Sequence, residues 1–440
     1  MIDQTLRPEK KSVGSISATL PKTDRKRIVI VGGGFAGIEL IRKLRDTSYE
    51  VVMIDKNNYH SFIPLLYQVA TAGLSPGDIS SPLREFMQHF ENFHFRLASI
   101  ETIEANRNVI QTSKGELAYD ILVIATGSVP NFYGNKKIAQ ASLRLREIRD
   151  ALTLRNTLID RFEEALLLSE QEEQQAYLNV VIVGAGPTGV ELAGAIGELK
   201  RHILPKDYPE LDFSMMKVFL VEGADQVLPA MSKEAGRKAR KYLEKFNVKV
   251  ILGKMVNDLD KEIVRLSDGE QITSNCLIWA AGVKGNLIPG LSEQSTDRSQ
   301  YLVDQYNIVK GTDNIYAIGD VSLQKNPAFE DGLPMLAPVA IQQARHLGHN
   351  LVRLDKGQKP KAFHYLDKGT MATVGRNKAV VDFPFKLTLG GFVGWFIWMF
   401  VHLMSIIGFR RKLLVFSNWI WNYLTYNKGN RLIIPREKEA

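Results

Sequence analysis

The chain carries two copies of one short pattern, a run of β-branched residues followed by a glycine-rich turn. The first copy reads IVIVGGGFAG at 28–37, and the second reads VVIVGAGPTG at 180–189. Each has the order strand, Gly-x-Gly-x-x-Gly turn and helix start, in which the turn approaches a pyrophosphate at the helix N-terminus. Two copies on a chain of 440 residues predict two doubly wound α/β units, each able to bind a dinucleotide.

The three glycines of each turn have different tasks. The first permits a tight turn, the second lets the backbone approach the pyrophosphate, and the third lets the helix pack closely on the strand. The glycines predicted to bind cofactors are Gly32, Gly34 and Gly37 in the first turn and Gly184, Gly186 and Gly189 in the second.

An acidic residue ends the next predicted strand in both units. Asp55 lies 23 residues after Gly32, where a carboxylate is expected to bind a ribose hydroxyl. Glu222 lies 38 residues after Gly184, and the insertion HILPKDYPELDF before its strand accounts for the longer spacing. A carboxylate there repels a 2′-phosphate, so the sequence predicts NADH over NADPH. The alternative is that Glu222 only ends a strand.

The single cysteine excludes several classes of redox protein. Cys276 alone cannot form a disulfide framework, a Cys-rich zinc site, an iron–sulfur cluster or a redox-active CxxC pair. We expect it to pack in the apolar run CLIWAAG. No metal site is predicted.

Small-residue turns after other apolar strands extend the pattern: ATGS at 125–128, AAGV at 280–283 and AIGD at 317–320. Together with the two glycine turns they resemble the two-dinucleotide-binding-domain flavoproteins, over about 27–355. The resemblance implies FAD in the first turn, NAD(P)H in the second, and Asp320 on the flavin ribitol. The further cofactor-binding residues that it implies are Ala125, Thr126, Gly127, Gly319, Ala281 and Gly282.

Three longer stretches narrow the family. NNYHSFIPLLYQVATAGLSPGDIS at 57–80, LAPVAIQQARHLGHNL at 336–351 and YLDKGTMATVGR at 365–376 closely resemble the type II NADH:quinone oxidoreductases. The resemblance implies a single-subunit FAD enzyme on a membrane surface, which passes electrons from NADH to quinone without pumping protons. Disulfide reductases and sulfide:quinone oxidoreductases need cysteines that this chain lacks.

The resemblance also implies residues for the quinone half of the reaction. An AQxAxQ motif lines the family's quinone tunnel, and here Pro338 replaces its first glutamine, which leaves Gln342 as the quinone candidate. Lys368 matches a family lysine near the flavin and the quinone, where its positive charge could stabilise the reduced, anionic flavin. Glu191 matches a glutamate that could orient the nicotinamide or bring a proton to the quinone. Gln68 lies in the loop that we expect to cover the flavin.

Each of these residues also has an ordinary structural reading. Gln342 could be a packing or capping amide, Lys368 a surface turn lysine, and Glu191 a carboxylate favoured by a helix N-terminus.

The C-terminal segment is aromatic and basic. Residues 392–409 contain no charged side chain, and Trp419, Trp421, Tyr423 and Tyr426 follow among polar residues. From Lys386 onward there are eight basic and two acidic residues, so this segment holds six of the chain's eight excess positive charges. Tryptophan, tyrosine and basic residues favour a bilayer surface with anionic headgroups, so we expect two interfacial helices. A membrane span and a buried dimer interface are the alternatives, and a nucleic-acid site is not expected.

The sequence therefore predicts an α/β protein with two Rossmann-like dinucleotide-binding domains, the second inserted in the first, and a C-terminal amphipathic membrane-anchoring segment. The predicted division is a disordered tail at 1–24, an FAD-binding domain at 25–140 and 286–360, an NADH-binding domain at 141–285, and the anchor at 361–440.

The predicted activity is transfer of electrons from NADH through FAD to a membrane quinone, menaquinone or ubiquinone, in a respiratory chain. The absent targeting peptide favours the cytoplasmic face of a bacterial membrane over the mitochondrial inner membrane, and we expect a peripheral homodimer. Two other readings share the flavin core. They are an NADH-dependent reductase of a soluble electron carrier, which leaves the aromatic tail unexplained, and an NADH-sensing redox switch.

Overall fold

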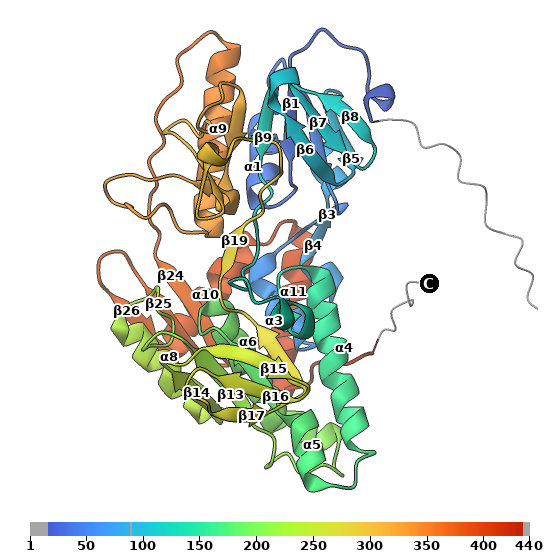
Figure 1. Cartoon of the computed structure of the whole chain (residues 1–440), viewed down its shortest axis with the longest axis vertical. Helices are drawn as coiled ribbons and strands as arrows, with labels where there is room; N and C mark the ends of the chain where they lie inside the picture. The colour runs from blue at the N-terminus through green and yellow to red at the C-terminus, as the bar shows by residue number, and fades with distance from the viewer. Residues whose placement is uncertain (1–15, 89, 434–440) are drawn as a thin grey trace, which may run out of the picture. The chain divides into compact units, whose positions relative to one another are not determined.

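The computed structural model describes residues 16–88 and 90–433 (Figure 1). The chain forms two compact units, each built from separate segments of the sequence. Unit 1 comprises 1–60, 82–129 and 284–366, and unit 2 comprises 61–81, 130–283 and 367–440. Apart from the tail 1–24, the predicted domain boundaries stay a prediction beside this division into two units.

Unit 1 is built on a five-stranded parallel sheet. The strands lie in the order β22 (Ile315–Ala317), β9 (Ile121–Ile124), β1 (Arg27–Val31), β2 (Glu50–Asp55) and β5 (Phe93–Leu97). The central strand β1 is a run of β-branched residues that are almost wholly buried, as expected for a parallel strand covered on both faces.

The helices α1 (Phe35–Lys43) and α9 (Ala337–Asp355) of unit 1 pack on each other. Two small three-stranded sheets complete the unit: β6 (Ile100–Glu104), β7 (Val109–Thr112) and β8 (Gly115–Ala118), then β20 (Thr296–Asp297), β21 (Gln300–Leu302) and β23 (Ser322–Leu323). Its 3-10 helices are η1 (Ser17–Thr19), η4 (Leu83–Met87), η5 (Ala105–Arg107), η6 (Glu293–Ser295) and η7 (Gly319–Val321).

Unit 2 repeats the five-stranded parallel sheet. Its order is β11 (Leu143–Arg144), β18 (Cys276–Trp279), β12 (Val180–Val183), β13 (Val218–Glu222) and β14 (Val248–Leu252). In both sheets the strand before the glycine turn is flanked by the next parallel strand and by the strand that enters a small-residue turn. The repeated sequence pattern therefore corresponds to a repeated topology, and Cys276 lies buried in β18 as predicted.

The remaining elements of unit 2 surround this sheet. A second sheet contains β15 (Val256–Asp260), β16 (Ile263–Leu266) and β17 (Gln271–Thr273), and a third contains β24 (Thr370–Gly375), β25 (Lys378–Asp382) and β26 (Thr388–Gly390). The helices are α2 (Leu66–Ala70), α3 (Lys136–Ala141), α4 (Ile148–Ala165), α5 (Gln171–Leu178), α6 (Pro187–His202), α7 (Leu204–Asp207), α8 (Lys233–Lys245), α10 (Gly391–Ser405) and α11 (Phe409–Thr425), with 3-10 helices η2 (Ile63–Leu65) and η3 (Pro76–Asp78). Short strands occur where the chain passes between units: β3 (Tyr59–Ser61), β4 (Ser80–Pro82), β10 (Ser128–Pro130) and β19 (Val283–Gly285).

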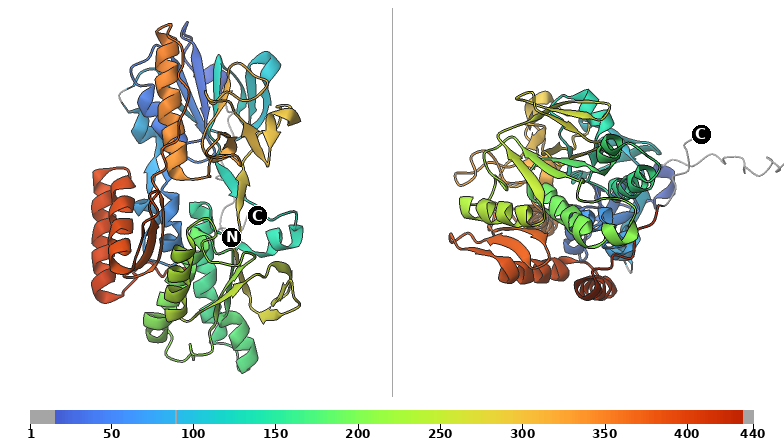
Figure 2. Two further views of the ribbon diagram at one scale, coloured as in Figure 1. Left: turned by 90° about the vertical axis from the view of Figure 1, so that its left-hand side faces the viewer. Right: turned by 90° about the horizontal axis from the view of Figure 1, so that it is seen from below.

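The C-terminal helices α10 and α11 lie on the same side of unit 2 (Figure 2). Within the described residues, 16–88 and 90–433, no helix combines the length and apolarity that crossing a bilayer requires.

One expectation from the sequence is wrong in part. The predicted disordered tail 1–24 includes Ile16 and Leu20, which are buried in the core of unit 1, and the Ile16 amide donates to the carbonyl of Lys114 (2.9 Å). Arg96 also donates to the Thr19 carbonyl (2.6 Å), so apolar burial and hydrogen bonds together hold this short segment. The rest of the predicted tail, 1–15, lies outside the described residues, as do the basic residues Arg436 and Lys438.

Candidate functional site: two glycine cradles and an aromatic cavity

The first glycine turn is packed so tightly that only glycine fits at two of its positions. Gly32 has φ +109°, and a Cβ there would lie 2.3 Å from the carbonyl oxygen of Ala125. A Cβ at Gly37 would lie 1.9 Å from the carbonyl oxygen of Gly32. Gly34 is different, because nothing lies within 4 Å of the place of its Cβ. Backbone atoms of the protein therefore fill the space beside Gly32 and Gly37, whereas the space beside Gly34 is empty. This empty space fits the approach of a pyrophosphate.

Asp55 ends β2 beside this turn. Its carboxylate accepts hydrogen bonds from the backbone amides of Gly33 (2.6 Å) and Asn57 (2.7 Å). The carboxylate therefore orders the loop, in addition to any contact with a ribose.

The other predicted FAD-binding residues meet at the ends of β9 and β22. Ala125 donates its amide to Val31 of β1 (2.8 Å), and Thr126 donates its hydroxyl to the carbonyl of Asn286 (2.7 Å). The Ser128 hydroxyl donates to the Asp320 carboxylate (2.6 Å). Gly127 and Gly319 both have positive φ, +68° and +75°. The nine residues predicted for FAD in this unit thus lie at one edge of the sheet: Gly32, Gly34, Gly37, Asp55, Ala125, Thr126, Gly127, Gly319 and Asp320.

Two residues that organise this edge were not predicted as site residues. The fully buried Gln343 accepts the Gly319 amide at its side-chain oxygen (2.7 Å) and so holds the turn that carries Asp320. His60 is buried, and its Nδ1 donates to the carbonyl of Gly33 (3.2 Å). Burial lowers the pKa of His60 to about 4, so it is neutral. The only sequence signal for Gln343 is its place one residue beyond Gln342, on the adjacent face of α9.

The glycine turn of unit 2 is packed in the same way as that of unit 1, and the two turns are named the cradles of their units. Gly184 has φ +98°, and its Cβ would lie 2.7 Å from the backbone oxygen of Ala280. A Cβ at Gly189 would lie 1.9 Å from the Gly184 carbonyl oxygen, and again nothing lies within 4 Å at Gly186. The second turn therefore has the same closed and open positions as the first.

Glu222 takes the place of Asp55 in this repeat. Its carboxylate accepts the amides of Ala185 (2.6 Å) and Ala224 (3.0 Å), so it also orders its loop. Ala281 and Gly282 follow β18, and Gly282 has φ +86°. All six residues predicted for NADH lie together in unit 2.

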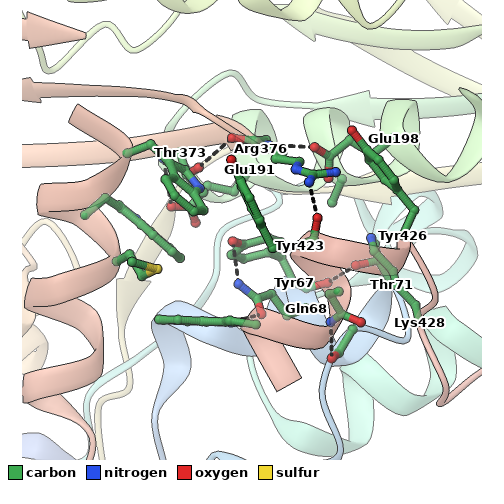
Figure 3. Close-up of a pocket in the computed structure, with 18 of the residues that line it drawn as sticks. Tyr67, Gln68, Thr71, Glu191, Glu198, Thr373, Arg376, Tyr423, Tyr426 and Lys428 are labelled. Atoms are coloured by element: carbon green, nitrogen blue, oxygen red, sulfur yellow. Dashed lines mark hydrogen bonds between the residues drawn. The ribbon is translucent and has the colours of Figure 1, made fainter. Parts of the chain in front are cut away.

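An aromatic cavity of about 120 Å³ lies elsewhere in unit 2. It is enclosed by α2, α6, β24, α10 and α11 together with the chain that follows α11 (Figure 3). Three tryptophans, three tyrosines and Met399 provide much of its wall: Trp395, Trp398, Trp419, Tyr67, Tyr423 and Tyr426. Two predicted site residues, Glu191 and Gln68, line it as well.

Glu191 is buried at one end of this cavity. The Thr373 amide lies 3.4 Å from its carboxylate, and Trp398 is 2% exposed beside it. Burial raises the pKa of Glu191 to about 8, although the Thr373 amide and the Trp398 indole act in the opposite direction. Glu191 therefore carries a proton at neutral pH.

Gln68 connects α2 to α11 across the cavity. Its side-chain nitrogen donates to the Tyr67 hydroxyl (2.9 Å), and its oxygen accepts the Trp419 indole N–H (2.8 Å). Asn422 donates to the carbonyl of Gly73 (3.2 Å) in the same region. The loop that we expected to cover the flavin holds α11 in place, and the contact of Gln68 with a flavin stays a prediction.

The other end of the cavity carries two ionisable side chains, Glu198 and Lys428, next to Tyr426. All three lie away from Glu191 (Figure 3). Arg376 lies over the rings of Tyr423 and Tyr426, 3.9 and 4.1 Å from their centroids, and donates to the Tyr423 carbonyl. Cation–π contacts and this hydrogen bond join the β24–β25 turn to the end of α11.

The remaining two candidates for the quinone step do not line this cavity. In unit 1, the side-chain amide of Gln342 makes two hydrogen bonds with the backbone of Leu366. Its nitrogen donates to the Leu366 carbonyl (2.9 Å), and its oxygen accepts the Leu366 backbone N–H (3.0 Å). Lys368 belongs to unit 2 and is exposed. The contacts of Gln342 fit the packing reading, and its quinone role stays a prediction, as does that of Lys368.

Comparison with known protein families gives two matches. The model of the pyridine nucleotide-disulphide oxidoreductases matches residues 26–344, and that of the NDH2 C-terminal domain matches residues 368–426.

Curated relatives share most of the length of the chain. The type II NADH:quinone oxidoreductase Ndh of Mycobacterium tuberculosis is 33% identical, over 94% of this chain and 92% of its own. NdhA of the same organism is 32% identical over 93% and 89%. The type II NADH:quinone oxidoreductase of Staphylococcus saprophyticus is 30% identical over 81% and 89%.

Solved structures share the fold. NDH2 from Plasmodium falciparum in complex with NADH aligns with a TM-score of 0.85 at 20% identity, over 93% of this chain and all of that one. The sulfide:quinone oxidoreductase of Aquifex aeolicus aligns with a TM-score of 0.67 at 18% identity, over 93% of both chains.

Proposed function

The chain belongs to the type II NADH:quinone oxidoreductases, and from this membership we propose which of its parts hold the two cofactors, the quinone and the lipid surface. The enzyme oxidises NADH and reduces a quinone, with FAD as its cofactor. FAD, when bound, accepts a hydride from NADH and supplies two electrons to the quinone.

FAD is assigned to the cradle of unit 1 and NADH to the cradle of unit 2. The open positions at Gly34 and Gly186 support this assignment, because each leaves room for a pyrophosphate at the start of a helix. The loop-ordering contacts of Asp55 and Glu222 support it further, since each carboxylate is fixed beside its turn.

The quinone is assigned to the aromatic cavity, and the position of Glu191 is the observation that carries this proposal. A protonated, buried carboxyl group stands among tryptophan and tyrosine rings, which suit a flat apolar ring with carbonyl oxygens that accept hydrogen bonds. Glu191 can donate such a hydrogen bond at neutral pH.

The lipid surface is assigned to the outer sides of α10 and α11. Large apolar side chains on these helices are exposed: Phe392, Val393, Phe396, Phe400, Val401, Met404, Phe409, Leu413, Leu414, Phe416, Ile420, Trp421 and Leu424. So large an exposed apolar face marks an interaction site, and the neighbouring Arg410, Arg411 and Lys412 suit anionic headgroups. We propose monotopic attachment at the cytoplasmic face of the cell membrane, and a homodimer as the assembled form.

One acceptor assay tests this function. Purified enzyme in vesicles is given NADH with a menaquinone analogue, a ubiquinone analogue, or a small soluble electron-transfer protein. Rapid turnover with a quinone is expected. Turnover with the protein carrier alone would favour the carrier-reductase reading, and slow turnover with every acceptor would favour the redox switch.

A further inference from the structure

Quinone reduction by NADH takes up one proton from water. The balance is NADH + quinone + H⁺ → NAD⁺ + quinol, so the hydride supplies two electrons and one proton, and water must supply the other proton. The inference rests on the proposed quinone cavity. Its inner end is closed to solvent, because Glu191 is 8% exposed. A proton that reaches the quinone must therefore cross from the surface to this end.

One face of α6 connects this inner end to the surface. Glu191, Ala195, Glu198 and His202 are spaced by four, three and four residues, so they lie along a single stripe of the helix. The first three line the cavity. Glu191 and Ala195 are buried, whereas Glu198 and His202 are partly exposed.

The gap between the two carboxylates can be bridged by water. Seven residues of helix span about 10 Å, which is too far for direct proton transfer. Ala195 lies between them and has only a methyl group, and the cavity of about 120 Å³ has room for several waters, because one water needs roughly 10–15 Å³ of cavity volume.

We propose that Glu198 and His202 form the proton uptake route of the quinone cavity, and that they pass protons from solvent through cavity water to Glu191. Each is a positioning and relay group that acts through Glu191.

Glu191 can release and take up a proton near neutral pH. Glu191 is protonated at pH 7, so it can give up its proton and be protonated again. Burial and Arg201 lower the pKa of His202, and the negative charge of Glu198 opposes this. His202 is also stacked on Tyr426, with ring centroids 4.2 Å apart. Because Tyr426 lines the cavity at the end away from Glu191, this contact holds His202 beside that end. Arg201 of α6 itself acts on His202. The charged and titratable groups that act on Glu198 and His202 from neighbouring elements are Tyr67, Lys206, Arg376, Lys378 and Lys428. Lys245 acts in turn on Lys378, and Arg431 acts on Lys428.

Two other directions are less suitable for proton transfer. His402, which stacks on Trp398, has a pKa lowered by burial to about 4, and its Nδ1 donates to the Trp398 carbonyl (2.7 Å). It therefore stays neutral. Along β24, α6 is in direct backbone contact, because a Cβ at Gly194 would lie 1.8 Å from the carbonyl oxygen of Val374. There is therefore no space for water between Gly194 and Val374.

The test compares two acceptors of the same full-length holoenzyme in vesicles. A quinone analogue takes electrons with protons, whereas ferricyanide takes electrons alone. We expect Glu198→Gln to lower quinone turnover by roughly tenfold at pH 8, with ferricyanide turnover unchanged. His202→Asn should have a smaller effect in the same direction. Formate added to Glu198→Gln should restore quinone turnover, and Glu198→Asp should retain most of the wild-type quinone turnover. The control Glu172→Gln, at an exposed position on α5, should match the wild type.

Two results would overturn the proposal. The first is wild-type quinone turnover by Glu198→Gln and by His202→Asn from pH 6 to 9. The second is a slow Glu198→Gln variant that neither formate nor the aspartate substitution restores, which would indicate a structural role. A wild-type enzyme that reduces ferricyanide but no quinone would instead contradict the proposed function.

Discussion

Gly186 and Gly189 are three residues apart, yet a methyl group would have different consequences at each. Gly189 is in backbone contact with Gly184, whereas the Cβ position of Gly186 is empty and its φ is −68°, which any residue adopts. The fold requires glycine at position 189, whereas only the proposed ligand requires glycine at position 186.

Alanine substitutions separate these two requirements. We expect Gly186→Ala to keep the wild-type melting temperature but to raise KM for NADH at least tenfold, because the methyl group occupies the pyrophosphate approach. Gly189→Ala should lower the melting temperature as well, since α6 must move away from β12. Ferricyanide kinetics and thermal unfolding of the holoenzyme measure both. An unchanged KM in folded Gly186→Ala would contradict the NADH assignment.

Glu191 makes stability depend on pH. Its pKa is about 8 in the folded protein and near 4.5 when exposed in the unfolded chain, so between these values the folded state binds one more proton. Stability from this group therefore falls as pH rises from about 4.5 to 8. Glu191→Gln removes this dependence and should stabilise the protein at pH 7 by about 3 kcal/mol. Denaturant unfolding at pH 5.5 and 7.5 checks this, and an equal loss of stability between these pH values in both proteins would contradict the burial of this carboxyl group.

The sequence predicts some site residues better than others. The glycines follow from local backbone geometry, so their spacing alone locates both turns. The carboxylates of Asp55 and Glu222 were expected to face a ribose, and their contacts with loop amides could not be read from spacing. Gln343 escaped prediction because a buried amide and an exposed one look alike in a helical sequence.

At the scale of elements, the repeated strand–turn–helix pattern predicts both parallel sheets. The aromatic cavity could not be predicted. Its walls come from segments near 67–73, 191–203, 373–376, 395–399 and 419–428, which only the fold brings together.

The exposed face of α10 gives a prediction for membrane attachment. Phe396 and Phe400 are 52% and 55% exposed and one turn apart. The double substitution Phe396→Glu with Phe400→Glu should release the enzyme from anionic vesicles in a flotation assay, because it places two charges on the lipid-facing side. Leu167→Glu, at a residue 85% exposed beyond the end of α4, serves as the matched control and should stay bound. If the double variant bound vesicles as well as the control, the assignment of the lipid surface to this face of α10 would be wrong.

At the scale of the whole molecule, each unit carries one glycine cradle, and unit 2 also carries the aromatic cavity and the exposed apolar side chains of α10 and α11. We propose that the quinone is reduced in this cavity. Ala195 places only a methyl group in the cavity wall, and a phenylalanine there would fill much of the space between Glu191 and Glu198.

Anaerobic stopped-flow absorbance of the flavin tests this claim most directly, with wild-type enzyme and Ala195→Phe. NADH should bleach the flavin at the same rate in both proteins, and ferricyanide should restore the colour equally. A quinone analogue should restore it at least tenfold more slowly in Ala195→Phe than in the wild type. Equal rates with quinone would show that the cavity is not the route to the flavin and would contradict the account.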